Sequence, residues 1–358
     1  MKNVVGKKSI CLKVQKTLGE KAIILAKKLE IVNKELEIKR NEVFIYIPLL
    51  RQPFKNELKA FKDQLLNYEI LTDVFSEKKK RVTFIEVLED KLPPHLLASL
   101  PKSIDFVGDI AIIEIPLELE AYRALIGEAI FKTHENVQTV LAKAGAVSGT
   151  YRLREFSVIA GKPKTETIHK EYGCQFYVDL AKAYFSPRLS YEHNRIASLV
   201  NDGETVIDMF AGVGPFSILI AKTHESVKVY AIDVNPDAIE FLQKNIRLNR
   251  VEDKVRPILG DAKQIVEEKL LGMADRVIMN LPEKAIEFLD AACKAIKLTG
   301  GIIHFYTFVN SSTSLDNMKL KFIKAAEKCG RKAEVLFSRF VRATAPYEWQ
   351  AVIDAKIL

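Results

Sequence analysis

The chain has 358 residues, of which 48% are hydrophobic, and a formal net charge of +8. This composition supplies packed cores and excludes wholesale disorder, and the length indicates two or three domains. No apolar run is long enough to span a bilayer and no signal-peptide pattern opens the chain, so we expect a cytoplasmic protein without a membrane partner. The four cysteines lie far apart and mark no metal site. The positive charge suits a polyanionic partner, but alone it is a weak indicator.

Residues 1–75 predict a small α/β module. Residues 23–29 have helical spacing, 42–48 form a strand pattern and 57–66 predict a second helix. The lysine-rich stretch that follows predicts a linker over residues 76–90.

Residues 91–172 predict a second small domain of α/β or α+β type. The expected elements are a strand at 109–115, a helix at 118–131 and a strand pair at 151–159 and 166–171, with the segment 137–142 and a glycine-punctuated stretch at 145–149 before the pair. A Gly-Lys-Pro turn signal separates the last two strands.

From residue 173 to 358 the pattern alternates between short apolar strands and helices. Strands are expected at 205–210, 228–234, 255–259, 276–281 and 301–308, each apolar on both faces. Two more, at 333–342 and 349–356, follow without a long helix between them. The pattern predicts an α/β fold whose parallel sheet ends in an antiparallel hairpin.

A glycine loop, DMFAGVGPF at 208–216, follows the first of these strands. Gly212 and Gly214 let a ligand approach the main chain. A dinucleotide fingerprint needs a third glycine, but Ser217 stands there, and the Asp208 carboxylate would oppose a pyrophosphate. That carboxylate could attract the ammonium group of S-adenosylmethionine. We therefore expect cofactor contacts from Asp208, Phe210, Gly212 and Gly214.

Acidic residues also end the second and third strands. Asp233 is placed to accept hydrogen bonds from ribose hydroxyls, and Asp261 could accept from the adenine amine. Asp261 is equally a candidate helix N-cap, and the two roles can coexist. Three acidic strand ends in order favour a cofactor site.

The fourth strand runs into Asn280 and Pro282, at the edge where ligands bind in such sheets. The Asn280 amide could orient a planar base and contact the cofactor, while Pro282 fixes the turn. The alternative is an ordinary helix start.

Several residues upstream of the glycine loop are candidates for substrate contacts. Tyr184 could stack on a base or belong to the core, and Glu192 falls in the first turn of a helix, where it could equally be a surface residue. Arg152 and Arg154 alternate in a predicted strand and so share a face, which suits phosphate or carbonyl binding or a solvated edge.

Together, the segments HENVQTVLAKAGAVSGTYRLREFSVIAG, TIHKEYGCQFYVDL and AYFSPRLSYE, with DMFAGVGPF and NLP, resemble the archaeal and eukaryotic tRNA (guanine-37-N1) methyltransferases. The resemblance is strongest over residues 130–310, and the N-terminal module fits only by size and position. It implies a class I (Rossmann-like) methyltransferase domain at 173–358, behind a module that inspects the tRNA elbow and a middle RNA-binding domain.

The resemblance also implies methyl transfer from S-adenosylmethionine to N1 of guanosine 37 in the anticodon loop. By motif position, Glu192 is the general base. Arg154, with Arg152 as the alternative, stabilises charge on O6. The other residues implied to act on the base or the RNA are Tyr184, Asn280, Pro282, Arg152 and Arg188. One departure is His193, where an arginine is expected directly after Glu192.

The same resemblance implies tRNA as the partner; separately, we expect a monomer, although no sequence feature reveals the oligomeric state. Magnesium dependence is common in the family, although no protein site for the ion is expected here. Alternatives within the fold are aminocarboxypropyl transfer to tRNA and methylation of a wybutosine tricyclic intermediate. A nicotinamide dehydrogenase is disfavoured by the missing third glycine, and a non-catalytic tRNA-binding protein is disfavoured by the full set of candidate catalytic residues.

Overall fold

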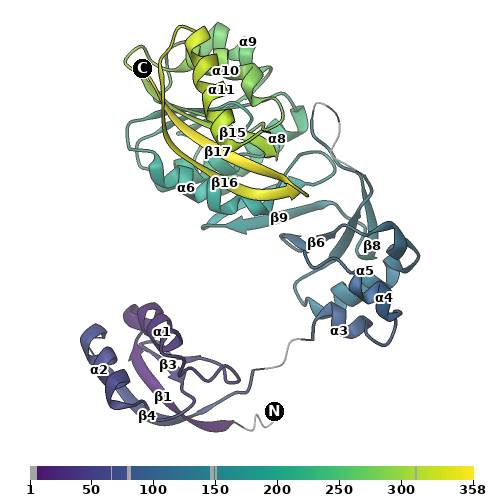
Figure 1. Ribbon diagram of the computed structural model, residues 1–358, viewed down its shortest axis with the longest axis vertical. Helices are drawn as coiled ribbons and strands as arrows, with labels where there is room; N and C mark the ends of the chain where they lie inside the picture. Colours follow the sequence, from purple (N-terminus) through teal and green to yellow (C-terminus); the bar gives the residue numbers. More distant parts are fainter. Residues whose placement is uncertain (1–5, 66, 79–81, 146–148, 150, 311–312) are drawn as a thin grey trace. The chain divides into compact units, whose positions relative to one another are not determined.

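The computed structural model describes residues 6–65, 67–78, 82–145, 149, 151–310 and 313–358. The chain divides into two compact units, Met1–Val82 and Thr83–Leu358 (Figure 1). None of the helices in the described ranges is long and apolar enough to cross a membrane.

The first unit is an antiparallel sheet with two helices. Its elements are β1 (Lys7–Gln15), a 3-10 turn η1 (Lys16–Leu18), α1 (Gly19–Lys28), β2 (Lys39–Arg40), β3 (Phe44–Pro48), α2 (Lys55–Gln64) and β4 (Tyr68–Phe75). The strand order is β2-β3-β1-β4. Leu12, Ile47 and Phe61 meet in its core and are fully buried. The two expected helices and β3 are confirmed, whereas β1 and β4 were not predicted.

The second unit begins inside the segment expected to be a linker. Helix α3 (Phe84–Leu88) starts with a capping box, because Thr83 Oγ1 accepts from the Glu86 amide at 3.2 Å and the Thr83 amide donates to Glu86 Oε2 at 2.6 Å. The predicted linker, 76–90, therefore extends too far; residues 79–81 within it lie outside the described ranges.

The second unit opens with a four-stranded sheet covered by helices. Its elements are α4 (Pro94–Ala98), β5 (Asp105–Val107), β6 (Ile110–Ile113), η2 (Leu117–Tyr122), α5 (Arg123–Thr133), β7 (Thr139–Lys143) and β8 (Phe156–Gly161), with strand order β5-β6-β7-β8. β8 starts later than expected, so Arg152 and Arg154 lie in the preceding loop and share no strand face; that expectation was wrong.

A hairpin of β9 (Glu166–Glu171) and β10 (Cys174–Asp179) connects this sheet to the rest of the unit. The Asp109 carboxylate, beside β6, accepts from Thr167 Oγ1 at 2.7 Å and from Lys164 Nζ at 2.6 Å. On the other side, Asn245 uses its amide to bond both the N–H and the C=O of Tyr177. β8 and β9 were expected as neighbouring strands, but they pair with β7 and β10 respectively.

The large sheet has seven strands in the order β13-β12-β11-β14-β15-β17-β16. The strands are β11 (Thr205–Asp208), β12 (Lys228–Asp233), β13 (Val255–Leu259), β14 (Arg276–Met279), β15 (Gly301–Asn310), β16 (Ala333–Ala345) and β17 (Glu348–Ile357). The first five are parallel, and β17 runs antiparallel between β15 and β16. The expected parallel sheet with a terminal hairpin is confirmed.

Helices cover both faces of this sheet (Figure 1). α6 (Ser190–Leu199), which follows the 3-10 turn η3 (Pro187–Leu189), packs on one face with α7 (Pro215–Thr223) and α8 (Pro236–Asn249). α9 (Ala262–Ile265), the π-helical η4 (Val266–Leu270), η5 (Ala285–Phe288), α10 (Leu289–Ala295) and α11 (Leu315–Lys328) pack on the other. Successive side chains of a strand point alternately into the two cores: Val206 belongs to one core and Ile207 to the other.

Candidate active site

A cavity of about 240 Å³ lies at the carboxyl ends of β11, β12, β13 and β14. The residues that follow each strand line it, as expected for a doubly wound sheet. The loop between β7 and β8 forms part of another wall through Gly149, Tyr151 and Arg152. The cavity is therefore built from the large sheet and from the smaller sheet of the same unit.

The cofactor candidates Phe210, Gly212, Asp233, Asp261 and Asn280 all line this cavity. The Asp233 carboxylate is oriented by two amides: Gly212 N donates to Oδ2 at 2.7 Å and Asn235 N donates to Oδ1 at 2.9 Å. Burial raises the pKa of Asp233. Asp261 is also the N-cap of α9, since its Oδ1 accepts from Lys263 N at 2.9 Å.

Asp208 does not take the expected position. Its side chain is fully buried beneath the glycine loop and does not line the cavity. Ser217 Oγ donates to Oδ2 at 2.8 Å, and Oδ1 has no partner among the described residues. Burial raises the pKa of Asp208 to about 7. Gly214, the left-handed N-cap of α7, also lies off the lining, so the loop meets the cavity through neighbouring residues.

Tyr184 and Arg152 also line the cavity, together with Asn280. The Arg152 guanidinium lies 4.7 Å from the Tyr184 ring centre and 3.4 Å from Glu283 Oε1. Arg152 has a φ of 57°, an uncommon backbone conformation for this residue type. Of the two candidate arginines, Arg152 lines the cavity and Arg154 does not.

The C-terminal hairpin ties these residues to one another. Arg342, on β16, donates to Tyr184 Oη at 3.2 Å and to Ser186 Oγ at 3.1 Å. Arg342 Nε also donates to Gln350 Oε1 at 2.9 Å, and Gln350 Nε2 donates to Asn280 Oδ1 at 3.2 Å. One continuous set of hydrogen bonds thus orients the tyrosine and the amide.

Two further candidates lie outside the cavity lining. Pro282 is buried and its carbonyl accepts from Phe308 N at 3.3 Å. Arg188 is exposed and pairs with Asp105 Oδ1 at 2.5 Å.

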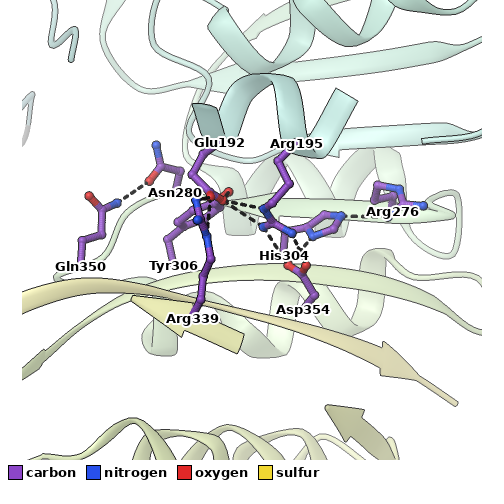
Figure 2. A network of polar contacts seen from close by, with 9 residues as sticks. All are labelled: Glu192, Arg195, Arg276, Asn280, His304, Tyr306, Arg339, Gln350 and Asp354. Atoms are coloured by element: carbon purple, nitrogen blue, oxygen red, sulfur yellow. Dashed lines mark hydrogen bonds and ion pairs between the residues drawn. The ribbon is translucent and has the colours of Figure 1, made fainter. Parts of the chain in front are cut away.

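Glu192 is 1% exposed, so its interpretation as a surface helix residue was wrong, while its position in the first turn of α6 is confirmed. Figure 2 shows its carboxylate enclosed by side chains from α6, β15 and β16. Oε2 accepts from Tyr306 Oη at 2.7 Å and from Arg195 Nε at 3.0 Å. Oε1 accepts from the Arg339 guanidinium through two nitrogens, Nε at 3.0 Å and Nη2. Glu192 itself does not line the cavity, but its neighbours Leu189 and His193 do, so the carboxylate lies just behind the cavity lining.

The network continues away from the cavity (Figure 2). Arg195 Nη1 donates to Asp354 Oδ2 at 2.5 Å, and the other oxygen accepts from His304 Nδ1 at 2.6 Å. Arg276 Nη1 lies 2.8 Å from His304 Nε2 and must be the donor, which assigns the histidine proton to Nδ1. Burial lowers the pKa of His304, consistent with this neutral ring. Although burial opposes it, hydrogen bonds from His304 and Arg195 lower the pKa of Asp354 to about 2.

Residues 167–336 match the TRM5/TYW2 methyltransferase domain, residues 84–165 the TYW2 N-terminal domain, and residues 11–57 the tRNA methyltransferase 5 N-terminal domain. The tRNA (guanine(37)-N(1))-methyltransferase Trm5b of Pyrococcus abyssi is 40% identical over 349 residues, covering 97% of this chain and 99% of its own. This chain belongs to the TRM5/TYW2 methyltransferase family.

Solved structures of family members match this chain over nearly its whole length. The crystal structure of Trm5b from Pyrococcus abyssi gives a TM-score of 0.71 at 39% identity, covering 98% of this chain and 99% of the other. The complex of aTrm5 with tRNALeu gives 0.69 at 37% identity, covering 98% and 100%.

Family members with other activities match less of this chain. The tRNA 4-demethylwyosine(37)-methyltransferase Taw21 of Saccharolobus solfataricus is 38% identical and covers 71% of it, with 94% of its own length aligned. A tRNA(Phe) (4-demethylwyosine(37)-C(7)) aminocarboxypropyltransferase of Methanocaldococcus jannaschii is 36% identical and covers 70%, with 96% of its own length aligned.

The family domain begins at residue 167, within β9, whereas the expected boundary at 172/173 falls in the turn between β9 and β10. Sequence reasoning also missed the residues that hold Glu192: Arg195, Tyr306 and Arg339. Polar residues within the otherwise apolar strands β15, β16 and β17 could have indicated this network. Gln350 and Asp354 of β17, for example, are buried.

Proposed function

We propose that this protein transfers the methyl group of S-adenosylmethionine to N1 of guanosine 37 in tRNA. The observation that carries the proposal is the match, over 97% of the chain at 40% identity, to a tRNA (guanine(37)-N(1))-methyltransferase. The cavity at the strand ends supports it independently. One part of its lining, the cofactor edge, contains Gly212, Asp233, Gly260 and Asp261, and the lining also includes the Tyr184 ring, the Asn280 amide and the Arg152 guanidinium.

The residues of the cofactor edge fit S-adenosylmethionine. Asp233 presents a buried carboxylate fixed by two main-chain amides, which suits the two hydroxyls of a ribose. Gly212 and Gly260 line the cavity with φ of 53° and 155°, so the main chain stays open to a ligand where a side chain would be strained. Asp261 and Phe288 border the same edge and suit an adenine. When bound, the cofactor supplies a methyl group activated by its sulfonium.

Guanine N1 carries a proton, so its methylation needs a base, and we propose Glu192 for this role. The carboxylate is held by Tyr306, Arg195 and Arg339 directly behind the turn of α6 that lines the cavity. Because both oxygens are occupied, Glu192 must exchange at least one of these donors for the guanine N1–H. General base catalysis of this kind contributes about 10²–10⁴-fold to the rate.

We propose Arg152 as the group that stabilises charge developing on O6 of the guanine. Its guanidinium lines the cavity and stacks on Tyr184, whereas Arg154 lies off the lining. A guanidinium aimed at a developing oxyanion lowers the transition state more than the ground state. Arg152→Ala should therefore slow single-turnover methylation more than Arg154→Ala; a larger effect at Arg154 would reverse the assignment.

The remaining candidates position the base and the RNA. Tyr184 and Asn280, joined through Arg342 and Gln350, form the wall on which a splayed-out guanine could stack and hydrogen-bond. Pro282 shapes the turn behind Asn280. Arg188, exposed in η3 just before α6, is proposed to contact the RNA backbone by exchanging Asp105 for a phosphate.

The first unit is proposed to recognise the tRNA elbow. It has its own core around Phe61 and is a separate compact unit, so its removal should leave residues 83–358 folded. We expect the truncated protein to bind S-adenosylmethionine as the full chain does, with weaker tRNA binding. Unchanged tRNA affinity would contradict this role.

The direct test is mass spectrometric mapping of methylated nucleosides after incubation of the protein with S-adenosylmethionine and unmodified tRNA. We expect 1-methylguanosine at position 37. A tRNA with adenosine 37 serves as the control and should stay unmethylated. Product only on a 4-demethylwyosine-containing tRNA, or transfer of an aminocarboxypropyl group, would instead support one of the other activities found in the family.

A further inference from the structure

One end of the cavity combines a helix N-terminus with a buried histidine. Pro215 and Phe216, the first residues of the nine-residue α7, line the cavity together with His193. The first-turn N–H groups of a helix have no acceptor inside the helix. The N-cap here is Gly214, which offers no side-chain acceptor. This end of the cavity therefore carries the partial positive charge of α7.

His193 adds an unpartnered polar atom at the same place. It is 1% exposed, and its ring packs edge-on against Phe216 with the ring centres 4.6 Å apart. Its Nδ1 lies 2.6 Å from Glu171 Oε1, so the carboxylate accepts a hydrogen bond from it. Nε2 is buried and has no partner among the described residues. A buried ring nitrogen that is left without a protein partner is available to a ligand in the cavity.

Glu171, which lies against this imidazole, is a buried carboxylate. The Glu171 side chain is 4% exposed, and the groups at its oxygens are His193 and His169, whose Nε2 is 3.7 Å from Oε2. Burial opposes ionisation of Glu171, but His169 and His193 lower its pKa to about 2. A buried carboxylate is stabilised by neighbouring donors and positive charge, and these two imidazoles are the groups that the structure places beside it. With Nδ1 bonded to Glu171, a protonated His193 offers its Nε2–H to an anion.

We infer that His193, held by Glu171, and the N-terminus of α7 together bind the carboxylate of the methionine moiety of S-adenosylmethionine. This assignment rests on the proposed function. Because His193 is enclosed and borders the same cavity as Asp233, a small carboxylate reaches it more easily than an RNA phosphate, which would bring its backbone along. It also gives a role to the histidine that stands where the resemblance suggested arginine: Glu171 holds Nδ1 and leaves Nε2 for the ligand.

The test compares calorimetric binding of S-adenosylmethionine and of its decarboxylated form, which differ only in the carboxylate. The wild-type protein should prefer S-adenosylmethionine by about 10- to 100-fold, the range of a charge-assisted hydrogen bond. His193→Phe should lower this preference by at least about threefold by weakening S-adenosylmethionine alone, with the decarboxylated ligand changed less than that. His95→Gln, at an exposed position on α4, is the matched control and should keep the wild-type preference.

Equal weakening of both ligands in His193→Phe would make the histidine a packing residue, and an unchanged preference would remove it from the site. An unchanged preference with weaker tRNA binding would assign it to an RNA phosphate instead. If His193→Phe does not fold, Glu171→Gln keeps an acceptor for Nδ1 but removes the charge, and it should lower the preference by at least threefold. Failure of the wild-type protein to bind either ligand would contradict the proposed function itself.

Discussion

Replacing Asp354 by asparagine should destabilise the second unit in a pH-dependent way. Asp354 is 4% exposed and joins Arg195 to His304. Its ordinary pKa of 3.8 falls to about 2 in the fold, a difference that corresponds to about 2 kcal/mol of stability. Because the pKa is lowered on folding, this stability is present above pH 4 and is lost as the pH falls from 4 toward 2. At pH 3 about half of it should remain.

The assay is urea unfolding followed by the fluorescence of Trp349, the only tryptophan of the chain, which lies on β17 five residues before Asp354. At pH 7, Asp354→Asn should unfold with about 2 kcal/mol less free energy than the wild-type protein, and at pH 3 with about half that deficit. Asp316→Asn, at a side chain that is 85% exposed on α11, should show no such trend. A deficit independent of pH would refute the argument, because it would show that the asparagine acts through packing and not through charge.

Four other changes test the remaining contacts. Glu192→Gln should lower the single-turnover methylation rate by about 100-fold or more while tRNA and cofactor affinities stay within threefold, and a near-normal rate would remove it as the base. Arg339→Ala should lower that rate by about tenfold, with partial recovery in Arg339→Lys; equal rates in both variants would mean that the cation has no part in holding Glu192. Asp233→Ala should weaken S-adenosylmethionine binding by about tenfold or more in calorimetry, and unchanged affinity would contradict its ribose contact. Gly127→Ala should destabilise the second unit by about 1–3 kcal/mol in thermal unfolding, because the added Cβ would stand 2.6 Å from the Ile159 carbonyl oxygen. This clash should outweigh the gain in helix propensity of about 1 kcal/mol, and a stabilised variant would show that α5 can shift.

The large sheet was predictable because its strands are short, apolar on both faces and separated by helices. That pattern located β11 to β15 to within a few residues and indicated the hairpin that follows. β1 and β4 of the first unit were missed because their sequences alternate imperfectly: the lysines of β1 lie among residues that the antiparallel partners bury. Such strands owe their burial to neighbours far along the chain, which a local pattern does not contain.

At the site, residues that directly follow strands were predictable, since the parallel sheet brings Asp233, Asp261 and Asn280 to one edge. The side-chain directions were not. Asp208 follows the same rule of position, yet it turns inward to Ser217, and the contact depends on how α7 packs over the loop. The choice between Arg152 and Arg154 likewise depended on where β8 begins, and only the fold shows that both lie in the preceding loop.

The placement of β17 has a consequence for synthesis of the protein on the ribosome. This strand follows every other described strand in the chain but lies inside the sheet, between β15 and β16. Until it emerges, β16 has no strand to pair with, and Arg339 cannot be held over Glu192. A nascent chain that already has its complete glycine loop therefore still lacks the contact between Arg339 and Glu192. Activity should therefore appear only after β17 has been synthesised. In a chain that ends before Glu348, β15 and β16 would both lack the strand that lies between them.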